Sequence, residues 1–269
     1  MPAYFDIAVN LVGSALEHEI DTVIEDAAKL RVSPLLVIGS DLAESTKALA
    51  LTQAHPHRLY CTAGVHPHQA SSWNDASSAE LTQLCAAAQV VALGECGLDY
   101  NRDFSPRPVQ RRVFAAQLEL AAKLKMPVFM HERDANRDFI AIVKEYRPHL
   151  PNALLHCFTG DRAMLDACLA LDLHLGITGW VCDERRGQEL AALVPDIPDD
   201  RIMIETDSPY LLPRNLRPKP KSSKNKPEYL PHISEHIAGL RGQDPSQFAA
   251  LCYHNSLRFF GLEHDHVGT

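Results

Sequence analysis

Short apolar runs alternate with longer amphipathic stretches along the chain. Eight runs rich in aliphatic residues predict strands, and most stretches between them repeat apolar residues every three or four positions, as helices do. The expected strands cover residues 4–11, 35–38, 59–65, 90–95, 127–131, 153–156, 174–178 and 202–207. Strands that alternate with helices predict a parallel sheet. We therefore expect an α/β fold, a TIM (β/α)8-type barrel, for which 269 residues is a typical length.

The expected helices lie between these strands, and two more follow the last strand. They cover residues 17–30, 42–54, 80–88, 109–125, 136–145, 161–171, 189–194, 232–240 and 245–262. Ser33 and Pro34 are expected to break the first helix before the second strand, and Ser40 or Asp41 to cap the second helix. Residues 1–269 are expected to form one domain with helices at its C-terminal end.

An open, doubly wound sheet is the alternative arrangement for the same alternation. Its usual nucleotide-binding forms carry a G-x-G-x-x-G string after the first strand or a Walker loop. Neither string occurs in the sequence. The barrel is therefore the preferred prediction.

Four apolar runs end in a residue that can bind a metal ion. These residues are Glu95, His131, His156 and Asp207. In a parallel barrel the carboxyl ends of all strands meet on one face, so residues far apart in sequence can converge there. One such histidine alone would more readily be a structural residue, but four coincidences favour a site. Carboxylates and imidazoles together suit Mg²⁺, Mn²⁺, Zn²⁺ or Fe²⁺ at a catalytic centre.

Three of the residues near these strand ends are candidates for further roles. Asp207 is expected to orient or deprotonate a water at the metal, with a helix cap as the alternative role. His66 and His68 follow the third strand and are separated by a proline. Because their side chains point in different directions, at most one needs to face the site, as a catalytic or substrate-binding group.

Composition limits the class of protein. Hydrophobic residues make up 46% and charged residues 22%, as in a globular protein with a substantial core. No apolar run approaches the roughly 20 residues of a membrane span, and residues 1–13 lack the features of a signal peptide. Seven cysteines without a C-x-x-C pair fit a reducing compartment. We expect a cytoplasmic monomer with no membrane association.

One segment of the chain is strongly basic. The net charge of −8 argues against nonspecific coating of nucleic acid, but residues 214–226 contain six basic and no acidic residues. They are Arg214, Arg217, Lys219, Lys221, Lys224 and Lys226. This segment follows the strand of Asp207, so it is placed to hold a polyanion by its phosphates, or else is a solvated loop. Arg133 and His68 are expected beside it at the mouth of the site.

Six ordered strings give the chain a family resemblance. They are GVHPH (64–68), GECGLD (94–99), PVFMH (127–131), LHCFTG (155–160), ETDSPYL (205–211) and NKPEYLP (225–231). Together they resemble the TatD family of metal-dependent deoxyribonucleases over nearly the whole chain. GITGWVCDERRG (176–187) resembles the member after which the family is named more than its paralogues.

The resemblance implies a barrel of the amidohydrolase-like superfamily that hydrolyses nucleic acid with a divalent metal, Mg²⁺ first, with Mn²⁺ or Zn²⁺ as alternatives. The implied activity is exonucleolytic, from the 3′ end of single-stranded DNA or RNA, in DNA repair or degradation. By position, the four strand-end residues match the family's metal and catalytic residues. Glu95 and Asp207 are thus expected both to bind metal and to act in catalysis, and His66 matches an active-site histidine.

The first strand departs from the family pattern. Many relatives carry a His-x-His pair there, whereas this chain has Ala8 and Asn10. Without these two imidazoles, weaker metal binding or one firmly held ion is expected. The same substitution resembles the founding member, so activity is expected to remain.

Two other functions are compatible with parts of this pattern. A small-molecule amidohydrolase would share the metal site but has no use for the basic segment. A non-catalytic nucleic-acid-binding barrel has no reason to keep four polar groups whose burial is costly. Both are less favoured than a nuclease.

Overall fold

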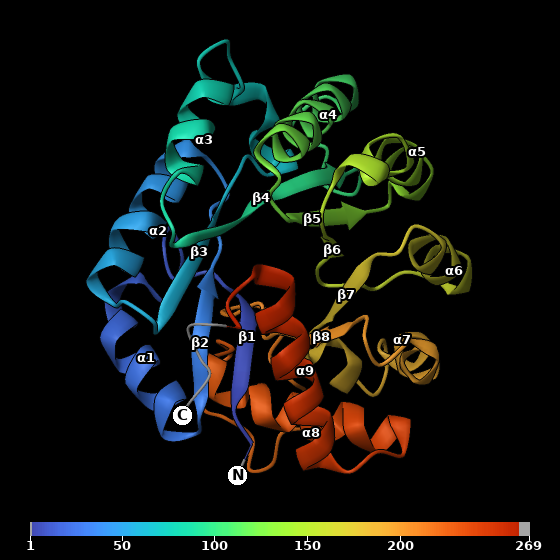
Figure 1. Cartoon of the computed structure of the whole chain (residues 1–269). Coiled ribbons are helices and arrows are strands. Elements are labelled where there is room, and N and C mark those ends of the chain that lie inside the picture. The colour runs from blue at the N-terminus through green and yellow to red at the C-terminus, as the bar shows by residue number, and fades with distance from the viewer. Residues whose placement is uncertain (1, 264–269) are drawn as a thin grey trace.

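The computed structural model describes residues 2–263 and contains a sheet of eight parallel strands in the order β1 to β8 (Figure 1). Each strand pairs with its neighbour in sequence. The strands are β1 (Tyr4–Val9), β2 (Val32–Val37), β3 (Leu59–Ala63), β4 (Val90–Asp99), β5 (Val128–Arg133), β6 (Ala153–Leu155), β7 (His174–Ile177) and β8 (Ile202–Ile204). The eight predicted strands are confirmed.

Helices surround the strands on the outside (Figure 1). The α-helices are α1 (Ile20–Lys29), α2 (Leu42–Ala54), α3 (Ser77–Cys85), α4 (Arg107–Leu124), α5 (Asn136–Tyr146), α6 (Arg162–Ala170), α7 (Gln188–Leu193), α8 (Leu230–Arg241) and α9 (Pro245–Phe260). Short 3-10 helices are η1 (Glu17–Glu19), η2 (Pro67–Ser72), η3 (Arg147–His149), η4 (Gly179–Cys182), η5 (Val194–Asp196) and η6 (Pro227–Tyr229). The predicted cap of α2 is Asp41, whose side chain accepts a hydrogen bond from the Glu44 amide.

The sheet closes into a barrel where the segment after β8 meets β1. The Asp207 amide donates to the Ala8 carbonyl at 3.0 Å, and the Asn10 amide donates to the Ser208 carbonyl at 2.8 Å. The buried Asp6 carboxylate accepts from the Thr206 amide at 2.9 Å. These contacts confirm the barrel and exclude the open sheet. They also place Asp207 beside the first strand, 197 residues away from Asn10 in the sequence.

The C-terminal helix fills the end of the barrel at which the strands begin. A buried cluster joins side chains of the barrel interior with the end of α9. Its members include Phe5, Ile7, Leu36, Phe129, Leu154, Met203, Phe259 and Phe260. The rings of Phe5 and Phe260 lie 5.7 Å apart. Phe259 and Phe260 are thus packing residues, and the opposite end of the barrel is left for polar residues.

Three strands extend beyond their predicted boundaries. Strand β2 begins at Val32 and includes Pro34, because the pairing of β1 with β2 is irregular there and such irregularities tolerate proline. Strand β4 continues past Glu95 to Asp99, and β5 continues past His131 to Arg133. Glu95 and His131 thus lie within paired strands, which fixes their backbones more firmly than a loop would.

Two glycines allow β4 to run so close to β5. Gly94 and Gly97 have φ angles of 147° and 149°, which residues other than glycine rarely adopt. A Cβ at Gly97 would also lie 1.9 Å from the His131 carbonyl oxygen. The glycines that flank Glu95 in the sequence therefore bring its strand against the strand of His131.

Within residues 2–263, none of the helices combines the length and the apolar character needed to cross a bilayer. His264, Asp265 and His266, which resemble a metal trio in the sequence and for which no function is expected, lie outside the described residues.

Candidate metal centre

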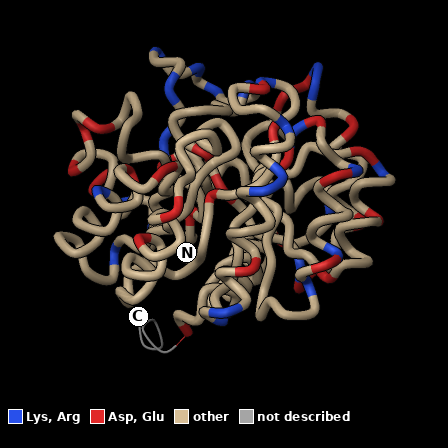
Figure 2. Tube along the Cα trace, turned by 90° about the horizontal axis from the view of Figure 1, so that it is seen from above, with Lys and Arg blue, Asp and Glu red and all other residues tan. Residues whose placement is uncertain are grey.

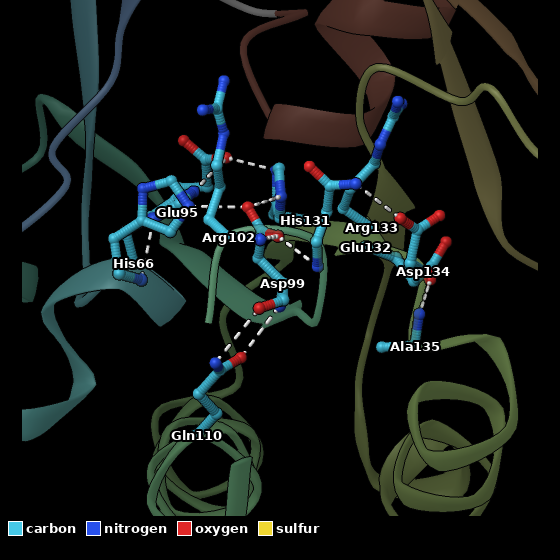
Figure 3. Close-up of polar contacts among 12 residues, drawn as sticks. His66, Glu95, Asp99, Arg102, Gln110, His131, Glu132, Arg133, Asp134 and Ala135 are labelled. Atoms are coloured by element: carbon cyan, nitrogen blue, oxygen red, sulfur yellow. Dashed lines mark hydrogen bonds and ion pairs between the residues drawn. The ribbon is translucent and has the colours of Figure 1, made fainter. Parts of the chain in front are cut away.

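Glu95 lies at the centre of three imidazoles. Its Oε1 is 2.8 Å from Nε2 of His156, 3.1 Å from Nδ1 of His131 and 3.4 Å from Nε2 of His66. Figure 3 shows His66 and His131 converging on the Glu95 carboxylate from different elements. The four residues come from β4, β5 and the segments after β3 and β6. The convergence expected of the barrel's carboxyl end is thus present.

The donor set fits a divalent cation. One ligand atom each from His66, Glu95 and His131 lie within 4.8 Å of one another. The buried Nε2 of His131 has no hydrogen-bond partner among the described residues, as expected of an atom that is free to bind a metal. Imidazole nitrogens with a carboxylate form catalytic sites for Zn²⁺, Mn²⁺ or Fe²⁺. His66, which the sequence analysis predicted as a catalytic or substrate-binding residue, thus lies among the atoms that could hold a metal.

Asp99 is a second carboxylate in the cluster that the sequence analysis did not identify as a site residue. Its Oδ2 lies 2.6 Å from Nε2 of His68 and 3.6 Å from Nε2 of His131. The Gln110 side chain holds the Asp99 backbone by accepting from its amide and donating to its carbonyl (Figure 3). A strand that continues beyond Glu95 brings every second residue to the same side, so this spacing could have revealed Asp99.

The charges in the cluster support one another. Burial opposes ionisation of Glu95, but the surrounding histidines outweigh it and hold the pKa of Glu95 well below its usual value. The pKa of Asp99 is likewise lowered, against the effect of burial, by the neighbouring imidazoles of His131 and His68. Burial lowers the pKa of His66 to about 4, so this ring is neutral at neutral pH and has a lone pair for a metal.

His156 is enclosed by two glutamates. Its Nε2 faces Glu95, and its Nδ1 lies 3.5 Å from Oε2 of Glu205. Burial disfavours the charged ring, but both carboxylates outweigh it and raise the pKa of His156 well above its usual value. Glu205, fully buried, also accepts a short hydrogen bond from the Cys157 amide. The sequence analysis missed Glu205, although it stands two residues before Asp207 in the same string.

Asp207 faces the same cavity from the seam of the barrel. The Asn10 side chain donates to its Oδ1 at 3.0 Å, so a residue just after the first strand holds this carboxylate. Burial raises the pKa of Asp207 to about 7, with Glu205 and Glu95 adding to the effect. The cavity has a volume of about 340 Å³ and is lined by Asn10, Ser14, Glu44, His66, His68, Glu95, His131, His156, Asp207 and Tyr210 among others.

A second cavity of about 760 Å³ is formed by the basic segment and η4. Its lining includes Trp180, Asp183, Arg186, Arg214, Arg217, Lys219 and Lys221. The Arg186 guanidinium lies 4.4 Å from the centre of the Trp180 ring. The largely buried Asp183 carboxylate pairs with Arg186 at 2.8 Å and with Arg214 at 3.1 Å. This carboxylate ties the basic segment to η4.

The two cavities are lined by neighbouring residues of one segment. Tyr210, whose side chain is largely exposed, lines the first cavity, and Leu211 lines the second. Figure 2 shows several Lys and Arg residues on loops along the edge of the molecule opposite the marked C-terminus. The basic segment is therefore close to the candidate metal centre in the chain and forms a cavity of its own.

Two predicted substrate-binding residues have protein partners instead of lining either cavity. The Lys224 ammonium donates to the Ala15 carbonyl at 2.8 Å and pairs with Glu19 at 3.2 Å. Arg133 lies at the end of β5, beyond His131 (Figure 3), and donates to the Thr159 hydroxyl at 3.2 Å. Neither contact tests whether these residues bind a substrate.

Comparison with known proteins gives consistent matches over most of the chain. The family described as "TatD related DNase" matches residues 5–261. A "3'-5' ssDNA/RNA exonuclease TatD" from Pectobacterium parmentieri is 52% identical over 258 residues, covering 96% of this chain and 99% of the relative. A protein of the same name from Escherichia fergusonii is 50% identical, with the same coverage of both chains.

Solved structures show the same fold. A TatD homologue from Escherichia coli superposes with a TM-score of 0.87 at 23% identity, covering 96% of this chain and 98% of the other. A hydrolase of the TatD family from Entamoeba histolytica gives a TM-score of 0.86 at 25% identity, covering 97% and 99%.

Proposed function

This chain belongs to the family of TatD-related DNases, and we propose that it removes nucleotides from the 3′ end of single-stranded DNA or RNA by hydrolysing phosphodiester bonds. The observation that carries the proposal is the Glu95 carboxylate in contact with three imidazoles, at the carboxyl end of a barrel. Relatives about 50% identical over nearly the whole chain are named as exonucleases of this kind.

We propose that Glu95, His131, His156 and Asp207 hold a divalent ion, with His66 within reach as a further ligand. The resemblance to the family favours Mg²⁺, whereas the imidazoles of the site also suit Mn²⁺ or Zn²⁺. Such an ion supplies Lewis-acid polarisation of a phosphoryl oxygen and lowers the pKa of water. The close approach of His66, Glu95 and His131 supports this assignment.

The residues around the ion then have separate tasks. Asp207 orients the attacking water and accepts its proton, because its carboxylate lines the cavity beside the other proposed ligands. The Asn10 amide fixes the orientation of this carboxylate by its hydrogen bond to Oδ1. His68, held by Asp99, lines the cavity where a phosphate would enter and can donate to a phosphate oxygen.

We propose that the rest of the strand occupies the second cavity. Arg214, Lys219 and Lys221 line it and can pair with successive phosphates. Trp180 lines the same cavity and offers a ring on which a base can stack, a contact that tolerates any sequence. This cavity is of no use to an enzyme that acts only on a small amide, which favours a polymeric anion as the substrate.

Other parts of the function follow from the resemblance and are also proposals. The protein acts as a cytoplasmic monomer and as one domain over residues 1–269. Its place in the cell is the repair or degradation of DNA.

The activity can be tested with single-stranded oligonucleotides labelled at the 3′ or the 5′ end. Wild type and Asp207→Asn are compared in EDTA, Mg²⁺, Mn²⁺ and Zn²⁺. Immediate release of the 3′ label, absent in EDTA and reduced at least 100-fold in the variant, is expected because general-base catalysis contributes about 10²- to 10⁴-fold.

Asp196→Asn is a matched control for this experiment. Asp196 belongs to η5, before the start of β8, and its side chain is exposed and pairs with Arg162. It should retain wild-type activity. No cleavage by the wild type with any of the metals would refute the nuclease and direct attention to small amides and esters. Binding of the oligonucleotide without cleavage would instead favour a non-catalytic barrel.

A further inference from the structure

Glu205 is a buried acid to which the proposed mechanism gives no task. It is 0% exposed and lies on the far side of His156 from Glu95. The two glutamates contact different nitrogens of the ring, with Glu95 near Nε2 and Glu205 near Nδ1. His156 is itself only 4% exposed, so water does not compete freely for either nitrogen.

The facing atoms of His156 and Glu205 have no other partner. Within the described residues, neither Nδ1 of His156 nor Oε2 of Glu205 forms a hydrogen bond, and 3.5 Å separates them. The other carboxylate oxygen, Oε1, is engaged by the Cys157 amide. Buried polar atoms are nearly always paired in native proteins. A small ring movement that brings Nδ1 onto Oε2 would pair both atoms.

The neighbouring strand leaves room for this carboxylate. A Cβ at Gly176 in β7 would lie 2.6 Å from Oε1 and 3.2 Å from Oε2 of Glu205. Any larger residue at this position would displace the carboxylate from His156. The glycine and the Cys157 amide therefore hold Glu205 in a defined place.

We propose that Glu205 is a positioning residue that fixes the proton of His156 on Nδ1 and thereby directs the Nε2 lone pair at the metal. A histidine that binds a metal usually donates its other N–H to a carboxylate or carbonyl, which fixes the tautomer and the ring orientation. The role rests on the proposed metal-dependent function and adds a residue to it.

Glu205→Gln reverses the hydrogen bond without changing the size of the side chain. The Cys157 amide requires an oxygen as its partner, so the glutamine Nε2 must face His156. That group is a donor, and it needs a lone pair on Nδ1. The ring proton then moves to Nε2, where it blocks the metal. Glu132→Gln is the matched control. Glu132 lies in β5, a strand of the same sheet, and its side chain accepts a hydrogen bond from the Ala135 amide.

Two measurements are made on each full-length protein. Calorimetry with Mn²⁺ should show 10- to 100-fold weaker binding for Glu205→Gln and wild-type binding for Glu132→Gln. Nitrogen-15 NMR of histidine-labelled, Mg²⁺-saturated protein, with His156→Gln to assign the signal, should show a protonated Nδ1 in the wild type and an unprotonated Nδ1 in Glu205→Gln.

The NMR signal separates positioning from simple loss of charge. A weaker affinity with Nδ1 still protonated in Glu205→Gln would overturn the proposal, as would unchanged affinity. Gly176→Ala, which moves the carboxylate and keeps its charge, carries the test if Glu205→Gln does not fold, and wild-type metal binding by that variant would equally overturn it. Neither measurement needs nuclease activity, so failure of the proposed function would show separately as metal binding without cleavage.

Discussion

Metal binding at the Glu95 cluster should strengthen steeply as the pH rises from 6 to 8. Asp207 must be ionised to act as a ligand, and burial raises the pKa of its carboxyl to about 7 in the metal-free protein. His156 must also lose a proton from Nε2, and its pKa lies well above the usual value. Binding a metal therefore releases protons, and its affinity follows the pH.

The contribution of Asp207 can be worked out separately. With a pKa of about 7, roughly a tenth of the Asp207 carboxyls are ionised at pH 6 and roughly nine tenths at pH 8. This group alone thus increases the metal affinity about tenfold over that range, or about 1.4 kcal/mol. His156 adds to the increase in the same direction, since its proton is also lost more easily at higher pH.

The assay is calorimetric titration with Mn²⁺ at pH 6, 7 and 8 in two buffers with different heats of ionisation, which counts the protons released. Asp207→Asn should bind Mn²⁺ more weakly at every pH. The factor by which its affinity rises between pH 6 and pH 8 should be about ten times smaller than in the wild type. Asp196→Asn should keep the wild-type dependence. Equal pH dependence and equal proton release in wild type and Asp207→Asn would refute the assignment of Asp207 as a ligand that must ionise.

Two further predictions concern the basic segment and the seam of the barrel. Lys219→Ala with Lys221→Ala should lower the slope of oligonucleotide affinity against salt by about 1.4, measured by fluorescence anisotropy, because each of the two phosphate contacts to a single strand contributes about 0.7. Lys224→Ala should leave the slope unchanged, since the Lys224 ammonium is bound to the Ala15 carbonyl and to Glu19 and does not line the second cavity. Equal slopes for all variants would contradict the proposed strand path. Burial raises the pKa of Asp6 from 3.8 to about 8. Between these pH values the folded protein therefore binds more protons than the unfolded chain, so its stability falls as the pH rises. In urea unfolding, the free energy of unfolding of the wild type should fall by several kcal/mol relative to that of Asp6→Asn between pH 4 and pH 8, at about 1.4 kcal/mol per pH unit. A difference in unfolding free energy that stays constant with pH would count against a buried, protonated Asp6.

The sequence was most informative where function and strand geometry impose the same pattern. Glu95, His131, His156 and Asp207 each follow an apolar run, and the fold brings all four to one cavity. Any chain with eight alternating strands and helices places its strand ends together, so this convergence needed no knowledge of distances. Their roles as ligands remain predictions.

The sequence did not reveal Asp99 or Glu205. The predicted strand ends at Glu95, whereas Gly94 and Gly97 let β4 continue against β5 as far as Asp99. Glu205 stands among apolar residues of a strand, and only its position against His156 gives it a task. A sequence shows which residues share a strand, but it does not show which side chains of different strands meet.

The basic segment shows the same limit. Its composition alone predicts an anion site, because six positive charges without an acid repel one another unless something binds them. Which lysines face a ligand depends on acids elsewhere in the chain. Lys219 and Lys221 line the second cavity, while Lys224 forms an ion pair with Glu19, which is far away in the sequence.

The alternation of strands and helices, the polar strand ends and the basic segment were determined by local sequence, because hydrophobic periodicity and charge are properties of neighbouring residues. The closure of β8 on β1, the contact of Asn10 with Asp207 and the enclosure of His156 by two glutamates were decided only by the tertiary structure. These contacts join residues that are far apart in the sequence, 61 positions for His156 and Glu95 and 197 for Asn10 and Asp207, and their formation depends on the packing of the whole barrel.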